Sequence, residues 1–242
     1  MPFRELGLEE VADYLHLTQA DVRALLKNQE IPHEQRGGRM VFRKREIETW
    51  ASQRILGLGE KRLAEYHQKS TQGTRHLLAD GVLLPRMLKP EYIGATLAAK
   101  TRASLLRELV SLAESTGLVM DPRELLKSLE EREALCSTAL PGGMAVPHPR
   151  HYQHYLFEGS FIVVGRALQE IHFGGPDGQP TDLFFLICCQ DDRFHLHTLA
   201  RLCLMAQKTE MLACLREAPD AAAMYECLVT CESEALGKQA AV

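Results

Sequence analysis

The 242-residue sequence contains no long apolar run, because no stretch approaches the roughly 18 to 20 uninterrupted apolar residues that a membrane-spanning helix needs. Its first residues lack the apolar core of a signal peptide. A glycine-rich loop ending in Lys-Ser or Lys-Thr, which would bind nucleotide phosphates, is also absent. These absences predict a cytoplasmic protein that neither crosses a membrane nor holds a nucleotide in a P-loop.

The seven cysteines are odd in number and include no Cys-x-x-Cys redox pair. Most of them lie in apolar or helical runs, which predicts small buried side chains in a reducing compartment. These are Cys188, Cys189, Cys203, Cys214, Cys227 and Cys231. The spacing of Cys227 and Cys231 leaves structural zinc as an alternative, but no second pair in register would complete the site.

The formal net charge is -4, but the charged residues are distributed unevenly along the chain. Residues 1–70 carry 12 basic and 11 acidic side chains, whereas the remaining residues carry 16 and 21. Residues 23–45 alone hold seven basic side chains against two glutamates, a candidate contact surface for a nucleic-acid backbone. An ordinary solvated basic face is the alternative.

The length of the chain and its composition, 45% hydrophobic and 25% charged, allow one large domain or two small ones.

Two short helical patterns stand near the N-terminus, over residues 8–15 and 18–26. Thr18 is a favourable N-cap for the second, and Asp21 is placed to bind the backbone N–H groups of its first turn. Two short helices joined by a tight turn are typical of a helix-turn-helix.

After a stop at Ile31-Pro32, residues 36–42 predict two short strands around a Gly37-Gly38 turn. An amphipathic helix is expected over residues 45–55, with Ile47, Trp50 and Ala51 on its inner face.

Residues 7–54, taken together, resemble the winged helix-turn-helix of the excisionase or MerR type. The resemblance implies that the second helix enters the major groove and that the wing contacts the backbone. Position by position, the residues implied to face bases are Gln19, Ala20 and Arg23, with Lys27, Arg39 and Arg43 on phosphates. The sequence departs from the family at Gln19 and Ala24, where basic residues are common, and Asp21 adds a negative charge. A helix-turn-helix used for protein docking is the alternative.

The rest of the chain alternates helical and strand-like patterns, which predicts an α/β domain. Helical patterns cover residues 102–115, 122–133, 196–218 and 221–236, and apolar strand-like runs cover 159–165 and 181–189. The expected organisation is a helix-turn-helix domain over 1–56, a partly helical linker over 57–82 and the α/β domain over 83–242.

Residues 131–149 show little helical or strand periodicity but contain several polar and ionisable side chains. Pro147 and Pro149 flank His148 and hold it on a stiff, extended backbone. A histidine in such a place can act as general base, metal ligand, phosphoryl acceptor or plain loop residue, and its own residue type does not choose among them.

The run Glu131-Arg-Glu-x-x-x-Ser-Thr-x-x-x-Gly-Gly-x-Ala-Val-Pro-His148 resembles the active-site segment of phosphotransferase-system IIA domains of the fructose-mannitol class, which includes nitrogen-regulatory IIA proteins. The resemblance continues through residues 171–185 and His195-Leu-His-Thr-Leu199, and it spans about residues 83–236. It implies a mixed sheet flanked by helices.

The resemblance implies that His148 accepts a phosphoryl group from an HPr-type carrier, with Arg132, Ser137, Thr138 and His195 around it. A neutral imidazole is a good nucleophile, and fixed donors stabilise the charge on phosphoryl oxygens in transit. No cofactor or metal ion is needed for this chemistry.

Plainer roles stay open for these residues. Arg132 can instead pair with Glu131 or Asp182, and the hydroxyl groups of Ser137 and Thr138 can simply cap a turn.

A rival metal site can be drawn from five histidines: His148, His151, His154, His195 and His197. Pro149, however, breaks any helix that would align the first three. His195 and His197 lie two apart on a helix, so that only one can face the site. The motif favours His195 and leaves His197 as an ordinary helical residue.

The combined hypothesis is a regulator in which phosphorylation of His148 modulates DNA binding, with the helix-turn-helix as the reason to expect a homodimer. Its chemistry is transferase-like and its output is regulatory. The alternative is a soluble phosphocarrier that passes the group to a separate IIB partner, its N-terminal domain serving in protein docking. A third possibility is an interaction protein whose His148 is vestigial.

Overall fold

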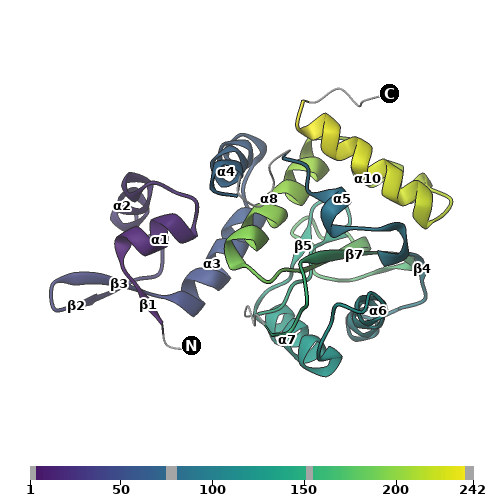
Figure 1. The fold of residues 1–242 in the computed structure, drawn as a ribbon, viewed down its shortest axis with the longest axis horizontal. Helices are drawn as coiled ribbons and strands as arrows, with labels where there is room; N and C mark the ends of the chain where they lie inside the picture. Colours follow the sequence, from purple (N-terminus) through teal and green to yellow (C-terminus); the bar gives the residue numbers. More distant parts are fainter. Residues whose placement is uncertain (1–3, 75–80, 151–154, 238–242) are drawn as a thin grey trace.

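The structure, a computed structural model, describes residues 4–74, 81–150 and 155–237. Figure 1 shows a small N-terminal part beside a larger C-terminal part, with helices α3, α4 and α8 between them. In the part of the chain that is described, no helix combines the length and the apolar character needed to cross a membrane.

The N-terminal part is the predicted helix-turn-helix with a β-hairpin and a third helix. Its elements are β1 (Glu5–Leu6), α1 (Leu8–Tyr14), α2 (Gln19–Lys27), β2 (Glu34–Arg36), β3 (Arg39–Arg43) and α3 (Lys44–Leu56). The strands form an antiparallel sheet in the order β1-β3-β2. Gly37 and Gly38 both have positive φ, +55° and +78°, which two-residue hairpin turns of this kind require.

Local signals fix the ends of these elements as predicted. The Thr18 hydroxyl accepts a hydrogen bond from the Asp21 backbone N–H at 3.1 Å, and the Asp21 carboxylate accepts one from the Thr18 N–H at 2.9 Å. This capping box starts α2 at the expected residue. At the other end, the Trp50 indole N–H donates to the Glu30 carbonyl at 2.6 Å and fastens α3 to the segment after α2.

The C-terminal part is the predicted α/β domain, built on a five-stranded mixed sheet in the order β4-β7-β8-β6-β5. Its strands are β4 (Ile93–Leu97), β5 (Ala139–Leu140), β6 (Met144–Ala145), β7 (Phe161–Ile171) and β8 (Thr181–Cys188). Its helices are α5 (Leu84–Met87), the 3-10 turn η1 (Pro90–Tyr92), α6 (Arg102–Ser115), α7 (Pro122–Leu135), α8 (Asp192–Lys208), α9 (Met211–Glu217) and α10 (Ala221–Ala235).

Helices cover the sheet on both faces, with α6 and α7 on one side and α10 on the other (Figure 1). The pairs β4 with β7 and β6 with β8 are parallel, while β7 with β8 and β5 with β6 are antiparallel. Both central strands are buried along most of their length. The predicted mixed sheet flanked by helices is therefore confirmed.

One predicted helix is wrong in its bounds. The pattern over residues 196–218 is two helices, α8 and α9, because Thr209 is extended and its hydroxyl donates to the Met205 carbonyl at 2.8 Å. The first of them starts earlier than predicted, since the Asp191 carboxylate accepts from the Phe194 N–H at 2.7 Å and caps it.

Helix α4 (Glu60–Gly73) lies within the segment expected to be a linker, and it packs against α8. Its His67 ring stacks on His197 of α8 with a centroid separation of 5.1 Å. The Ser70 hydroxyl is 2.8 Å from Nδ1 of the same histidine. His197 is thus a fully buried contact between α8 and α4, rather than the ordinary helical residue expected.

A buried ion pair joins four elements beside this contact. Arg201 of α8 is ion-paired with Glu232 of α10, and both side chains are fully buried. Glu232 also accepts hydrogen bonds from the backbone N–H groups of Leu83 and Leu84 at 2.9 and 3.0 Å. Arg201 Nε donates to His67 Nε2 at 2.7 Å, which extends the network to α4.

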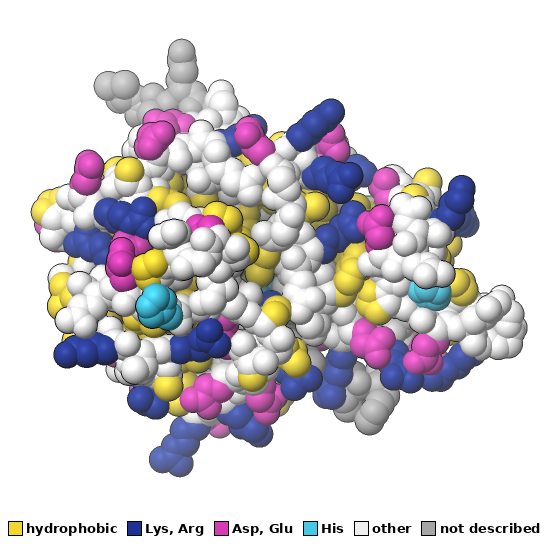
Figure 2. All heavy atoms as spheres, turned by 180° about the vertical axis from the view of Figure 1, so that it is seen from behind, with side chains coloured by type: hydrophobic (Ala, Val, Ile, Leu, Met, Phe, Trp, Pro, Cys, Tyr) yellow, Lys and Arg dark blue, Asp and Glu magenta, His cyan; other side chains and the backbone are white. Residues whose placement is uncertain are grey.

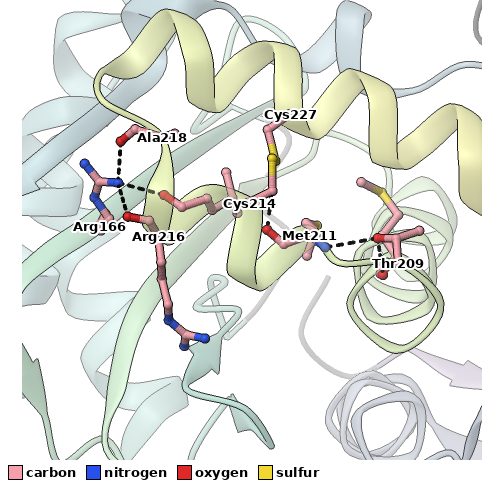
Figure 3. Close-up of a disulfide and its surroundings, with 9 residues drawn as sticks. Arg166, Thr209, Met211, Cys214, Arg216, Ala218 and Cys227 are labelled. Carbon is pink, nitrogen blue, oxygen red and sulfur yellow. Dashed lines mark hydrogen bonds between the residues drawn. A yellow bond between two sulfur atoms is a disulfide. The ribbon is translucent and has the colours of Figure 1, made fainter.

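The cysteines are buried as expected at positions 188, 189, 203 and 231, whereas Cys136 is partly exposed. The expectation that none is paired is wrong for Cys214 and Cys227, which form a disulfide between α9 and α10 (Figure 3). Their Cα atoms lie 6.2 Å apart because these two helices pack side by side. Cys227 is therefore not available for the zinc site that its spacing from Cys231 left open.

Replacing one member of the buried ion pair is expected to destabilise the chain strongly. Arg201→Met leaves Glu232 as an uncompensated buried charge, so we expect a loss of about 3–5 kcal/mol in the free energy of unfolding. Urea denaturation followed by circular dichroism measures it. Adding Glu232→Gln to Arg201→Met should restore part of the loss, and Arg107→Met, at an exposed arginine of α6, should change stability by less than about 0.5 kcal/mol. Equal stability of Arg201→Met and wild type would contradict the network.

Candidate functional site

His148 follows the short strand β6 on an extended segment, and only 2% of its surface is exposed. Its Nδ1 lies 2.8 Å from the Val146 carbonyl oxygen. Because a carbonyl oxygen only accepts, Nδ1 carries the proton and Nε2 keeps its lone pair. Nε2 in turn accepts a hydrogen bond from Arg132 Nε at 3.1 Å. The ring is held by both nitrogens with Nε2 as its basic atom.

Arg132, near the end of α7, is 1% exposed and is only partly satisfied by its surroundings. Its Nη1 donates to the carbonyl oxygen of Cys136 at 3.0 Å and contacts the sulfur of that residue at 3.3 Å. Its Nη2 is buried, and no residue of the described part of the chain accepts a hydrogen bond from it. Glu131 and Asp182, the alternative partners considered for Arg132, are ion-paired with other arginines.

His195 stands in the first turn of α8, with its ring centroid 4.8 Å from that of His148. It is fully buried. The N-terminal turn of a helix carries unsatisfied N–H groups and a partial positive charge, which favour an anion nearby. Arg132, His148 and His195, three of the predicted site residues, are therefore brought together from three separate elements.

Burial keeps both imidazoles neutral. It lowers the pKa of His195 to about 3, and the Arg132 guanidinium lowers it in the same direction. The pKa of His148 is held well below its ordinary value, first by burial and then by Arg132 and His195. A neutral ring whose Nε2 carries a lone pair instead of a proton is the nucleophilic form of histidine.

Ser137 and Thr138 lie beside this group but use their hydroxyls elsewhere. The Ser137 hydroxyl donates to the Phe173 carbonyl at 2.6 Å. Thr138 is fully buried and donates its hydroxyl to Glu133 at 2.8 Å, and the same carboxylate accepts from the Thr138 N–H. The Thr138 carbonyl accepts from Val146 N–H at 3.1 Å, so these contacts support the backbone that carries His148.

Two further residues belong to the site and carry no recognisable sequence signal. Cys136 accepts from Arg132, and Gln53 of α3 donates from Nε2 to the Cys136 sulfur at 2.9 Å. Gln53 and Cys136 lie 83 residues apart, and neither occupies a specified position of the motif segment in which it lies. Only the packing of α3 against the C-terminal part shows this connection.

The rival metal constellation is not assembled among the residues described. His197 points away from His148 toward α4, and His151 and His154 lie outside the described residues. In residues 4–74, 81–150 and 155–237, no three His, Cys, Asp or Glu side chains are grouped so that they could hold a metal ion.

The six residues predicted to contact DNA are all exposed. Gln19, Ala20, Arg23 and Lys27 lie on α2, and Arg39 and Arg43 lie on the hairpin strand β3. Arg23 donates to the Gln19 side chain at 3.3 Å, and Arg43 is ion-paired with Glu34 and Glu46.

The basic stretch is partly neutralised within the fold. Arg36, Arg43 and Lys44 are ion-paired with carboxylates. Figure 2 shows acidic and basic side chains intermixed over the N-terminal part. Asp21 pairs with Lys69 of α4 at 2.8 Å, and hydrogen bonding to Lys69 lowers its pKa to about 2. The carboxylate in the first turn of α2 therefore has its own partner.

The chain belongs to the family described as the phosphoenolpyruvate-dependent sugar phosphotransferase system, EIIA 2, which matches residues 86–230, more than half of its length. Residues 5–55 match a helix-turn-helix domain family. Both resemblances drawn from the sequence motifs are thus confirmed.

Among its relatives is a nitrogen regulatory protein of Bradyrhizobium diazoefficiens, which is 32% identical over 145 residues. That match covers 59% of this chain and 92% of the relative. A nitrogen regulatory protein of Pseudomonas aeruginosa is 25% identical over 153 residues, which cover 61% of this chain and 96% of the relative.

Solved structures share the fold of the C-terminal part. The nitrogen regulatory protein IIA-Ntr of Neisseria meningitidis has a TM-score of 0.52 and 24% identity, covering 59% of this chain and 97% of its own. IIA mannitol of Escherichia coli has a TM-score of 0.52 and 20% identity, covering 58% and 98%.

The buried neutral histidines predict a stability that falls in mild acid. Burial lowers the pKa of His67 and His195 to about 3 and that of His197 to about 2. In the unfolded chain these groups titrate near about 6.5, so below that pH the unfolded state binds more protons. We expect the free energy of unfolding to drop by up to about 1.4 kcal/mol per pH unit for each histidine.

Urea denaturation at pH 8, 6 and 5 measures this slope. His197→Gln should reduce the slope between pH 6 and 5 because it removes one of the titrating groups. A slope that is unchanged in this variant would show that His197 does not contribute.

Proposed function

We propose that the chain is a phosphotransferase-linked regulator, in which His148 accepts a phosphoryl group from an HPr-type carrier and its phosphorylation state modulates DNA binding. The observation that carries the proposal is the buried Nη2 of Arg132, an N–H donor without an acceptor beside a neutral histidine. A buried unpaired donor on a cation is unfavourable until an anion binds it. The oxygens of a phosphoryl group on Nε2 meet that requirement.

The transfer balances without a cofactor. The Nε2 lone pair of His148 forms the new N–P bond while the N–P bond to the carrier histidine breaks, and its electron pair returns to the carrier. The proton on Nδ1 stays in its hydrogen bond to Val146. Arg132 and the N-terminal turn of α8 stabilise the charge on the transferred group.

The DNA-binding half of the proposal is supported by the helix-turn-helix match and by the exposure of the six predicted residues on α2 and β3. In this arrangement α2 enters the major groove and the hairpin follows the backbone. Adding about two negative charges at His148 changes the electrostatics of the chain to which this domain is docked. A cytoplasmic location and a homodimer that spans two half-sites complete the proposal.

A soluble phosphocarrier is the second candidate. One structure of similar fold, with a TM-score of 0.50 and 19% identity, is the complex of enzyme IIAMtl with phosphorylated enzyme IIBMtl from Escherichia coli, and the match covers 58% of this chain and 96% of that one. In this alternative the phosphoryl group passes from His148 to a separate IIB protein, and the N-terminal part serves in docking.

Phosphorylation should depend on His148 and Arg132. Incubation with labelled phosphoenolpyruvate, enzyme I and an HPr-type carrier should label the wild type, and His148→Ala should abolish the label. Arg132→Met should slow labelling by about a hundredfold or more, because it removes the donor for the phosphoryl oxygens. His172→Ala, at an exposed histidine of the C-terminal part, is the matched control. Label retained by His148→Ala would remove this residue as the acceptor.

DNA binding should depend on the predicted surface. Arg23→Ala with Arg39→Ala should weaken binding to genomic fragments and reduce the salt slope by about 0.9 for each phosphate that the variant no longer neutralises. Arg107→Ala with Lys127→Ala, on exposed sites of α6 and α7, should leave both unchanged. Binding is compared by filter retention before and after phosphorylation. Absence of binding in both states would leave the phosphocarrier alternative.

A further inference from the structure

A chain of polar contacts runs from helix α3 of the N-terminal part to the acceptor nitrogen. Gln53 Nε2 donates to the Cys136 sulfur at 2.9 Å, and the sulfur and carbonyl oxygen of Cys136 both accept from Arg132 Nη1. The same guanidinium donates from Nε to His148 Nε2 at 3.1 Å. A residue of the helix-turn-helix domain thus takes part in holding the arginine of the phosphoacceptor site.

The position in which Arg132 is held is incompatible with the phosphorylated state. His148 Nε2 has one lone pair, since Nδ1 carries the ring proton, and that lone pair accepts from Arg132 Nε. The N–P bond needs the same lone pair. Arg132 must therefore withdraw Nε before transfer and turn its N–H groups toward the phosphoryl oxygens. Its contacts with Cys136 oppose this movement.

The interface that carries Gln53 contains polar side chains, some paired and some not. It includes a salt bridge at 2.7 Å between Lys44 of α3 and Asp192 in the first turn of α8. The buried hydroxyl of Tyr66 and the buried Nε of Arg193, on the facing helices α4 and α8, have no hydrogen-bond partner among the described residues. Unsatisfied buried polar atoms are unfavourable, so an interface that contains them is easier to open than a fully satisfied one.

We infer that Gln53 is a positioning residue of the phosphoacceptor site: through Cys136 it holds Arg132 on Nε2, so that docking of α3 restrains phosphorylation of His148. The inference rests on the proposed function and adds a route for its coupling. Because linkage is reciprocal, docking of α3 lowers the equilibrium constant for phosphorylation of His148, and phosphorylation lowers the equilibrium constant for docking by the same factor. Gln53 does not touch the phosphoryl group and is not itself a catalytic residue.

The test measures initial rates of labelling on the full chain with labelled phosphoenolpyruvate, enzyme I and HPr. Gln53→Ala removes the hold on Cys136, and we expect labelling about threefold to fivefold faster, the equivalent of one modest hydrogen bond. Gln53→Glu replaces the donor with a carboxylate of similar length, which can accept from the Cys136 S–H and adds a charge that attracts Arg132, so its rate should equal or fall below that of the wild type. Gln35→Ala, at an exposed glutamine of β2, is the control and should leave the rate unchanged.

A purely structural role predicts another pattern, because destabilising variants would slow labelling or leave it unchanged, with Gln53→Ala and Gln53→Glu alike. Thermal unfolding of each variant verifies that it is folded. Equal rates for wild type and Gln53→Ala would overturn the inference, as would acceleration by both variants.

Hydrogen exchange supplies a second measurement on the same protein. Phosphorylation of the wild type should speed exchange of the α3 amides, and unphosphorylated Gln53→Ala should show part of that increase. Unchanged exchange in α3 on a fully labelled chain would overturn the inference while leaving the proposed function intact. Failure of the wild type to take up label would instead overturn the proposed function itself.

Discussion

The packing of α8 between the two parts of the molecule is the constraint on which the rest of the structure depends. All residues from Phe194 to Met205 of this helix are buried, so each of its faces must match a neighbour. One face presents His195 to His148, and another presents His197 to α4. Because a helix moves as a stiff body, a displacement of its first turn would also displace the residues on both of these faces. The proposed phosphoacceptor site and the attachment of the N-terminal part therefore share one element.

Two buried arginines show how charge divides structure from function in this chain. Arg201 is neutralised by Glu232 and completes a closed network, which is the usual condition for a buried charge. Within the described residues, Arg132 has no ion pair to a carboxylate and its Nη2 has no hydrogen-bond acceptor. A buried cation with an unsatisfied N–H group is unfavourable for folding. Next to a neutral nucleophile, the same group is suited to bind an anion transiently. This contrast is the reason for proposing Arg132, rather than Arg201, as the functional arginine.

Those features of the fold and of the site that depend on a few neighbouring residues could be predicted from the sequence. The capping box at Thr18, the Gly37-Gly38 turn and the segment that ends at His148 could be predicted because each lies within a few consecutive residues. The strands β4, β5 and β6 could not, since strands of two to five residues are formed by pairing with distant partners and show no periodicity of their own. The Gln53–Cys136 contact and the Cys214–Cys227 disulfide were inaccessible for the same reason, because tertiary packing alone brings these residues together.

The N-terminal part is connected to α8 by a second route that does not pass through the phosphoacceptor site. Lys69 of α4 binds Asp21 in the first turn of α2, and two residues earlier on α4 His67 stacks on His197. Helix α4 thus spans from the start of α2 to the centre of α8. A shift of α8 would reach α2 through α4 as well as through α3. Contacts through α3 and through α4 thus join α2 to α8, which is the physical connection that the proposed phosphorylation-dependent control of DNA binding requires.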